Sequence, residues 1–267
     1  MASFSVVTNI ASVNAQANLY QTNQGLNLAL TRLSSGLRIN NSGDDAAGLA
    51  VANGYRSDIA VLQQGVQNAN DGLSTLQIKD GALNNISTLL DRLSTLATQA
   101  ASGGTTNASR TILNQEFQDV LSEINRESAV ANLNAASGFS VFVSNSSGNG
   151  VVAGTISAIS TSTLGISSLS ITAQGAASTA VSTIRAAIDI LGTSQGTIGD
   201  LENRLNFAIA LGNSQITNNT AAESRIRDAN IAQESAALTK YNILNQSGIA
   251  ALAQANNSTS AILALLR

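Results

Sequence analysis

The sequence predicts a mainly α-helical protein: long helices from both chain ends pack antiparallel as a coiled coil or bundle, with a small β-hairpin region mid-chain. The chain has 267 residues and no proline, and a proline inside a helix costs ~3 kcal/mol. Apolar residues recur every three or four positions over long stretches near both ends. Between about 138 and 178, apolar and small polar residues alternate instead, which favours short strands.

The first 37 residues carry two successive runs of helical spacing. The first run consists of Val6, Ile10, Val13, Ala17 and Tyr20. The second consists of Leu26, Leu30, Leu33 and Leu37. Gly36 follows two serines, and glycine readily adopts the left-handed conformation that ends a helix. The sequence therefore predicts that this helix stops around Ser34–Gly36.

A longer helix is predicted from Asp44 to Ala100. Ser42 is a candidate N-cap, and Asp44 and Asp45 would then lie in the first turn, where the helix dipole favours negative charge. The apolar spacing slips by one residue after Leu83 and then resumes, as happens in coiled coils without ending the helix. At 1.5 Å per residue, such a helix is about 85 Å long.

The rest of the chain predicts a third helix, a hairpin and two more helical segments. Gly103-Gly104 ends the long pattern, and the next helical face consists of Leu113, Phe117, Val120 and Ile124. Alternation places the two strands at Phe139–Val143 and Ser167–Thr172. Helical spacing returns at Val181, and Glu223 and Arg227 have the i,i+4 separation of a helical ion pair.

Composition excludes several classes of function. The chain has no histidine and no cysteine, which removes the usual general base, the thiolate nucleophile and most metal ligands. The sequence therefore predicts no enzymatic activity, no catalytic residue, no metal site and no cofactor. The Asp44-Asp45 pair is interpreted as a helix start and not as a ligand pair.

Nucleic acid and membrane partners are not expected. There is no basic patch or aromatic platform, and no apolar stretch approaches the ~20 residues of a transmembrane helix. The first ten residues lack the basic and apolar regions of a secretory signal.

The two chain ends are striped with apolar residues yet almost uncharged. No charge precedes Arg32, and none lies between Lys240 and Arg267. The C-terminal stripe consists of Leu238, Tyr241, Leu244, Ala251, Ile262 and Leu265. A lone helix of this kind is poorly stable in water. We therefore expect the two end stripes to be the assembly residues, and each to be the partner of the other.

Several ordered motifs resemble those of bacterial flagellin. The N-terminal motif is Leu33-Ser-Ser-Gly-Leu-Arg-Ile-Asn40 followed by Asp44-Asp-Ala-Ala-Gly-Leu-Ala50, and Gln67-Asn-Ala-Asn-Asp-Gly-Leu73 follows it. At the other end stand Ala221-Ala-Glu-Ser-Arg-Ile-Arg-Asp228, Ala250-Ala-Leu-Ala-Gln-Ala-Asn256 and a closing Leu-Leu-Arg267. The family-signature residues are Leu33, Gly36, Leu37, Arg38, Ile39, Asn40, Asp44, Asp45, Ala46, Ala47 and Gly48.

The chain departs from this family in three places. Gly43 stands where a basic residue often precedes the Asp-Asp pair. Asn257-Ser-Thr-Ser260 replaces the usual proline after Gln-Ala-Asn. The middle of about forty residues replaces the large outer domains of many flagellins, so the resemblance is to a short, minimal form.

The resemblance implies a structural subunit that self-assembles into the helical filament of the bacterial flagellum, for swimming motility. Residues 1–43 and 227–267 would form an inner terminal coiled-coil domain, the filament core. Residues 44–226 would form a helical bundle domain with the β insert at about 138–178. The implied location is extracellular, on the flagellum, after export without a cleaved signal peptide.

The implied partners are identical subunits, the flagellar type III export apparatus, an export chaperone, the filament cap and the hook–filament junction proteins. Arg92, Leu96 and Glu116 fall on positions through which the flagellin-sensing Toll-like receptor grips its ligand. Ser94 and Thr95 stand where receptor-active flagellins carry Arg and Glu, which implies weaker recognition. The alternative function is that of a hook–filament junction protein, and a cytosolic coiled-coil scaffold is the remaining one.

Overall fold

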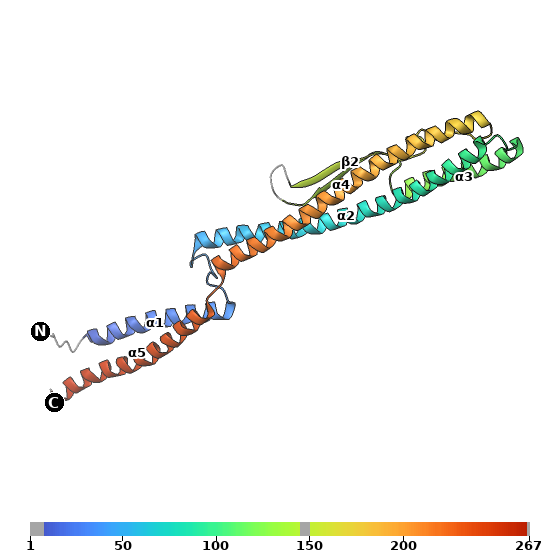
Figure 1. Ribbon diagram of the computed structural model, residues 1–267. Helices are drawn as coiled ribbons and strands as arrows, with labels where there is room; N and C mark the ends of the chain where they lie inside the picture. Colours follow the sequence, from blue (N-terminus) through green and yellow to red (C-terminus); the bar gives the residue numbers. More distant parts are fainter. Residues whose placement is uncertain (1–7, 145–149, 266–267) are drawn as a thin grey trace. The chain divides into compact units, whose positions relative to one another are not determined.

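The computed structural model describes residues 8–144 and 150–265, and of residues 258–265 only the backbone. The order of elements is α1 (Ile10–Ser35), α2 (Ala46–Ala101), α3 (Asn107–Val130), β1 (Ser137–Phe142), β2 (Val151–Ile156), α4 (Gln174–Arg227) and α5 (Ile231–Leu265). The predicted fold class, mainly helical with a small hairpin between the halves, is confirmed (Figure 1).

The chain forms two compact units. Unit 1 comprises residues 1–57 and 218–267, and unit 2 comprises residues 58–217. Unit 1 thus contains α1, α5, the start of α2 and the end of α4. Unit 2 contains α3, the hairpin and the greater part of α2 and α4.

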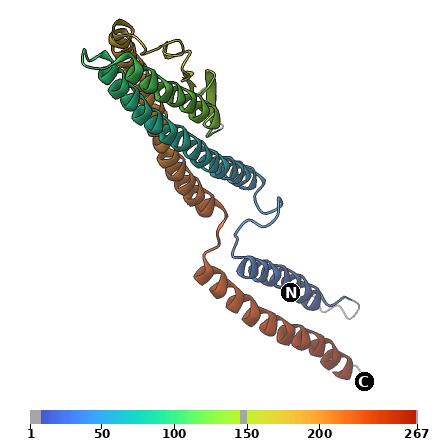
Figure 2. The same cartoon turned by 90° about the vertical axis from the view of Figure 1, so that its right-hand side faces the viewer.

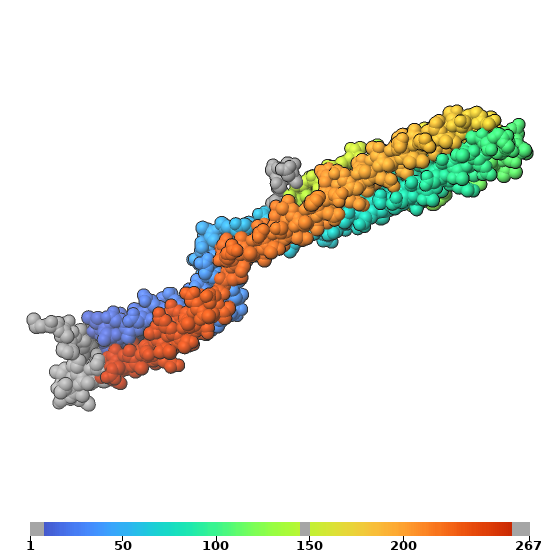
Figure 3. Space-filling model, in the orientation of Figure 1, coloured from blue at the N-terminus to red at the C-terminus, as the bar shows by residue number. Residues whose placement is uncertain are grey.

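The core of unit 2 lies between α2, α3 and α4, which run side by side in both ribbon views (Figures 1 and 2). Side chains leave no gap between α4 and α2 on the face that Figure 3 shows. Each helix contributes apolar residues at helical spacing to this core. The buried residues include Leu76, Leu90, Leu93, Phe117, Ile124, Ile184, Leu191, Ile198 and Leu205.

The slip in the apolar spacing of α2 coincides with a change of neighbours. Before Leu83, α2 packs against α4 and lies under the hairpin, where Asn68 Nδ2 donates to the Phe142 carbonyl at 3.1 Å. Near Lys79, the end of α3 joins it, because Lys79 Nζ donates to the Asn132 carbonyl at 3.0 Å. Ala82 and Leu83 are both buried. The buried stripe therefore widens at the point where α2 gains a second helical partner.

The hairpin pairs β1 and β2 antiparallel, with Phe142 opposite Val151 and Ser137 opposite Ile156. It lies close to α2 because α2 has glycine beneath it. A Cβ on Gly65 would stand 2.0 Å from the Val143 carbonyl oxygen, and one on Gly72 would stand 2.7 Å from Val141 Cγ2. On the other strand, Arg204 Nη1 of α4 donates to the Ala153 carbonyl at 3.0 Å.

The second predicted strand, Ser167–Thr172, is wrong, because the strand that pairs with β1 is Val151–Ile156. Residues 167–172 form a loop along α3 instead. Asn114 Oδ1 accepts from the Ile171 amide at 2.9 Å, and Gln118 Nε2 donates to the Leu169 carbonyl at 2.9 Å. Leu169 and Ile171 of this loop pack toward the core, while side chains of α3 satisfy the backbone.

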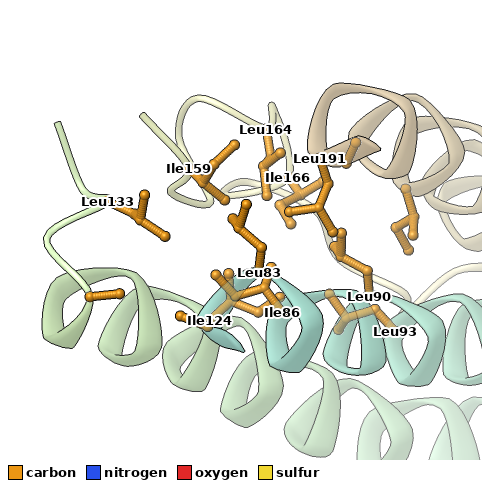
Figure 4. Packing of buried hydrophobic residues seen from close by; sticks show 14 of the residues in the cluster. Leu83, Ile86, Leu90, Leu93, Ile124, Leu133, Ile159, Leu164, Ile166 and Leu191 are labelled. Atoms are coloured by element: carbon orange, nitrogen blue, oxygen red, sulfur yellow. The ribbon is translucent and has the colours of Figure 1, made fainter. Parts of the chain in front are cut away.

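The loop before α4 supplies part of the core. Ile159, Leu164 and Ile166 are buried, and Figure 4 shows them pointing toward Leu83 of α2 and Leu191 of α4. This segment therefore closes one side of the bundle without regular secondary structure.

Glu202 of unit 2 has one carboxylate oxygen, Oε1, that is buried without a hydrogen-bond partner among the described residues. Desolvation, and then the nearby Asp80 carboxylate, raise the pKa of Glu202 above the ordinary value of a glutamate. The charged form of Glu202 therefore opposes folding.

We expect Leu205→Asp and Leu62→Asp to unfold unit 2, because both side chains are buried in the stripes that join α2 to α4. An unpaired charge there costs several kcal/mol. The matched control is Phe207→Asp, two residues along α4, where the side chain is 75% exposed. Thermal melts of monomers followed by circular dichroism should show loss of the cooperative transition in the first two variants only.

We expect Glu202→Gln to raise the melting temperature at neutral pH. A raised pKa means that the Glu202 carboxyl binds its proton more tightly in the native state than in the unfolded state. Protonation therefore stabilises the fold fully below the pKa of glutamate in the unfolded chain, about 4.3, and this stabilisation is lost as the pH rises through the pKa of the folded state. The gain from the substitution should therefore vanish near pH 3. A melting temperature that falls equally at every pH would contradict this assignment.

Candidate functional site

The terminal helices α1 and α5 pack against each other along their length in unit 1 (Figure 2). Asn9 Nδ2 donates to the Ala255 carbonyl at 2.8 Å, and Asn245 Nδ2 donates to Asn23 Oδ1 at 2.6 Å. Arg32 Nη1 meets Glu234 Oε1 at 3.4 Å near the other end of the pair. These three contacts show that the helices are antiparallel.

The face that α1 turns toward α5 is made of small and medium side chains. A Cβ on Gly25 would stand 2.5 Å from the ring of Tyr241, and one on Gly248 would stand 3.1 Å from Leu19. The helices therefore approach closely because position 25 is glycine, while a side chain at position 248 would press on Leu19. Among the described residues, Ala29 is the one side chain of α1 that is fully buried, and α5 has none. The pair buries little apolar surface by itself.

The predicted N-terminal stripe lies on the side of α1 that faces away from α5. Ile10 is 58% exposed, Val13 56% and Tyr20 66%, and Ala17 is exposed as well. At about 100° per residue, this stripe lies roughly opposite the half-buried residues that contact α5. These half-buried residues are Ser12, Ala15, Leu19, Thr22 and Leu26. The expectation that the two end stripes pair with each other is therefore wrong within one chain, and Val6 lies outside the described residues.

The C-terminal stripe is divided between two environments. Leu238 and Tyr241 are half-buried, whereas Leu244 and Ala251 are exposed, and the side chains of Ile262 and Leu265 lie outside the described ones. Further exposed apolar side chains of α5 are Ile231, Ile243 and Ile249. Their positions are spread around the helix axis, and a helix that is apolar all round needs cover on every side.

A shallow hollow lies between the two helices. It is lined by Leu19 and Thr22 of α1 and by Tyr241, Leu244 and Gly248 of α5, among others. The exposed apolar side chains on both helices make this pair the candidate interaction site. Sequence reasoning identified the stripes but missed that the N-terminal stripe and part of the C-terminal stripe point outward, because spacing alone does not say which face of a helix meets which partner.

The signature segment after α1 forms a clasp with the segment after α4. Gly36 has φ +71° and ends α1, as predicted. The Arg38 amide donates to the Arg227 carbonyl at 2.6 Å, and the Ala229 amide donates to the Gly36 carbonyl at 2.9 Å. Arg38 Nη2 donates to the Ile226 carbonyl at 2.8 Å. The clasp therefore joins the two chain segments that connect the terminal helices to α2 and α4.

The remaining signature residues set the start of α2, where the predicted N-cap Ser42 is wrong. Asp45 caps the helix instead, since its Oδ1 accepts from the Gly48 amide at 2.9 Å. Asp44 lies outside the first turn, and its Oδ2 accepts from the Asn40 and Asn41 amides at 3.0 and 2.9 Å. These backbone hydrogen bonds lower the pKa of Asp44. The first four amides of a helix have no partner within it, and Asp45 satisfies one of them, whereas Asp44 holds the turn that precedes the helix.

Other signature residues have packing roles. Ile39 is buried, while Leu33 and Leu37 are half-buried, and Ala46 and Ala47 are exposed. Gly48 is required by close approach, since a Cβ there would stand 2.4 Å from Asp45 Oδ2 and 2.9 Å from Ile39 Cδ1.

Two ion pairs flank the clasp. The predicted Glu223–Arg227 pair is confirmed at 3.8 Å. Sequence reasoning missed the Arg32–Glu234 pair because its partners are far apart in the chain. The available signal was that the two ends of the chain contain very few charged residues, and that Arg32 and Glu234 are two of them with opposite sign. Both pairs are partly screened from solvent.

The candidate receptor-contact residues are only partly accessible. Arg92 Nε donates to Glu116 Oε1 at 2.8 Å, which joins α2 to α3 at the surface of unit 2. Leu96 is 1% exposed and belongs to the core. In the folded chain, a binding partner would therefore touch Arg92 and Glu116 but not Leu96.

Within the described ranges, no three or more acidic, histidine or cysteine side chains gather as metal ligands would. No described helix has the length and apolar character needed to cross a membrane.

Comparison with known proteins assigns the two halves to one family. Residues 6–142 match the bacterial flagellin N-terminal helical region, and residues 181–266 match the bacterial flagellin C-terminal helical region. Flagellin FlaB1 of Treponema pallidum is 33% identical, with 97% of this chain and 98% of that protein covered. Flagellin of Halalkalibacterium halodurans is 35% identical over the same shares of both chains. The flagellar filament 33 kDa core protein of Treponema phagedenis is 33% identical, again at 97% and 98% coverage.

We expect Gly25→Ala to loosen the terminal pair, because the added methyl would overlap the Tyr241 ring. Trypsin should then cleave after Lys240 of α5 faster than in the unmodified chain. Gly81→Ala is the matched control, since a Cβ at Gly81 meets nothing within 4 Å. Equal cleavage rates in the two variants would show that the Gly25 contact does not hold the helices together.

Proposed function

The chain belongs to the bacterial flagellin family and is a structural subunit of the flagellar filament, and we propose that α1 and α5 are the elements through which its copies polymerise. In this proposal, residues 1–43 and 227–267 form the inner domain of the filament, and residues 44–226 form the bundle around it. The observation that carries the proposal is the outward direction of the N-terminal stripe, from Ile10 to Tyr20.

Free energy supports this assignment. Ordering a residue costs about 1–2 kcal/mol of backbone entropy, while burying a large aliphatic side chain contributes about 1.5–3 kcal/mol. Within one chain, α1 fully buries only Ala29 among the described residues. Neighbouring copies would cover Ile10, Val13 and Tyr20 on α1, and Ile243 and Ile249 on α5. Assembly then supplies the burial that the isolated pair lacks.

The similar proteins are called flagellin or filament core protein. These names favour the function of a filament subunit over the alternative, that of a hook–filament junction protein. Flagellins form a family of structural proteins, and the proposed role involves no catalysis.

The proposed route to the filament is export through the flagellar type III apparatus without a cleaved signal peptide, with an export chaperone, the filament cap and the hook–filament junction proteins as partners. The final location is extracellular. Two properties support export in the unfolded state. The chain has no cysteine that could form a disulfide, and the pair of helices α1 and α5 buries little apolar surface.

Recognition by the flagellin-sensing Toll-like receptor is proposed at the Arg92–Glu116 pair. Both side chains are about half exposed on unit 2. Leu96 would contribute by supporting the backbone from the core.

We expect removal of residues 233–267 to abolish filament formation and to leave the cooperative melt of residues 44–226 largely intact. Sedimentation measures the polymer, and circular dichroism measures the melt of the truncated monomer. Filaments of normal length from the truncated chain would refute the role of the terminal helices.

A point variant makes the same test without deleting a helix. Tyr20→Ser should impair polymerisation, because Tyr20 is the largest side chain of the exposed stripe and is 66% exposed. Asn14→Ser is the matched control, an exposed residue of α1 outside the stripe. The proposal requires that the control polymerise as the unmodified chain does.

A further inference from the structure

The faces with which α1 and α5 contact each other are repetitive. On α1 the buried and half-buried residues include a series at intervals of three and four, which is Ser12, Ala15, Leu19, Thr22, Leu26 and Ala29. On α5 the half-buried residues include a series with the same intervals, which is Leu238, Tyr241, Asn245, Gly248, Leu252 and Ala255. Because both faces repeat every seven residues, sliding one helix by seven residues restores the same spacing. Spacing alone therefore does not decide how the two helices align.

The structure has one alignment, and it begins at the clasp. Leu37 and Asp228 are bridged there as residues of two antiparallel strands are. Counted from this bridge, Asn23 lies fourteen residues back in α1, and Asn245, which donates to it, lies seventeen residues on in α5. The two counts are nearly equal, so the alignment of the clasp continues into the helix pair.

The same agreement holds at both ends of the helix pair. Arg32 and Glu234, which form the ion pair nearest the clasp, lie five and six residues from the bridge. At the far end, Asn9 donates to the Ala255 carbonyl, and these residues lie twenty-eight and twenty-seven residues from the bridge. The alignment that the clasp starts is therefore kept over the described length of α1.

Short connections tie both helices to the clasp. Gly36 is the C-cap of α1, and its carbonyl accepts from the Ala229 amide at 2.9 Å. Helix α5 begins at Ile231, two residues after Ala229. A slide of seven residues would move α5 by about 10 Å along α1, whereas two residues span at most about 7 Å. The closed clasp is therefore incompatible with the alternative alignment of intact helices.

Arg38 holds the clasp with both its backbone and its side chain. Its amide donates to the Arg227 carbonyl at 2.6 Å. Its guanidinium donates to the Ile226 carbonyl from two nitrogens, from Nε at 3.3 Å and from Nη2 at 2.8 Å. A cation beside the last carbonyls of a helix is also favoured by the helix dipole. The Arg38 side chain thus fixes the end of α4, from which α5 follows after three residues.

We propose that Arg38 is the positioning residue that sets the alignment of α1 with α5. With the clasp closed, one of the equally spaced alignments is selected, and the Tyr241 ring then meets Gly25 and not a residue seven positions away. The selected alignment also decides which exposed side chains of α5 lie beside the outward stripe of α1. This inference concerns a single chain and goes beyond the proposed function, for which filament formation supplies a separate measurement.

The absence of cysteine from the chain allows the alignment to be measured with two reporters. Asn23→Cys/Asn245→Cys places thiols at positions that contact each other. Gln16→Cys/Asn245→Cys places them at positions that would face each other after a slide of seven residues. Full-length monomers are treated with dibromobimane, which fluoresces once it links two thiols and spans less than one helical turn. The fluorescent single-chain product on denaturing electrophoresis measures each alignment.

We expect the first reporter to be linked in preference to the second. Arg38→Met should lower the ratio of the first yield to the second roughly tenfold, the change expected when a hydrogen bond from a charged group is lost. The matched control is Arg225→Met, which removes an exposed arginine from the last turn of α4 and should leave the ratio unchanged. Arg38→Lys retains a cationic donor and should restore part of the ratio.

An unchanged ratio in Arg38→Met would overturn the proposal. Equal loss of both products would overturn it as well, since Arg38 would then hold the helices together without selecting their alignment. Ala229→Pro removes the amide that donates to the Gly36 carbonyl. This second variant should shift the ratio in the same direction, and a ratio that stays constant in it would show that the clasp does not set the alignment.

Filament formation separates this inference from the proposed function. Sedimentation should give a higher critical concentration for Arg38→Met than for Arg225→Met, because a slid α5 presents its exposed side chains at the wrong height. A shifted alignment with unchanged polymerisation would support the role of Arg38 and overturn the proposed role of α1 and α5 in assembly. An alignment that does not shift would overturn the role of Arg38 alone.

Discussion

The terminal helices carry apolar side chains on more sides than one partner can cover, and much of the structure follows from that constraint. One face of helix α1 packs against α5, and Ile10, Val13 and Tyr20 lie exposed on the opposite face. Helix α5 has exposed isoleucines in several directions. Such helices gain stability when other helices cover them, and in the proposed filament copies of the chain supply that cover.

Unit 2 meets a different requirement. Its helices each find enough cover inside one chain, because α2 and α4 run along each other and α3 and the loop from 157 to 173 close the remaining side. This unit has the size and the burial of an independent domain. The two units thus differ: unit 2 buries its apolar side chains within one chain, whereas unit 1 leaves many of its own exposed.

Local patterns predicted local structure well. The stripes of α2, α3 and α4, the end of α1 at Gly36 and the Glu223–Arg227 pair all depend on residues within a few positions of each other. The wrong second strand has a different cause, which is that a distant partner decided the outcome. Residues 167–172 alternate like a strand, but Asn114 and Gln118 of α3 take the place of a paired strand.

The candidate site shows the same limit. The residues of the N-terminal stripe could be chosen from spacing, yet their direction depends on Gly25 and Gly248, which allow the opposite face to approach α5. Ser42 was a reasonable N-cap from sequence, but Asp45 lies nearer the first free amides and accepts one of them. The Arg32–Glu234 pair joins residues 202 positions apart, which no local pattern can predict.

The hairpin has a consequence for a protein that is packed densely with its own copies. A sheet of two strands has two edges, and an exposed edge invites pairing with a strand of another molecule. Here helix side chains engage both strands from outside: Asn68 donates to the Phe142 carbonyl of β1, and Arg204 to the Ala153 carbonyl of β2. With one acceptor on each strand occupied, pairing of the hairpin with a strand of an adjacent subunit is hindered.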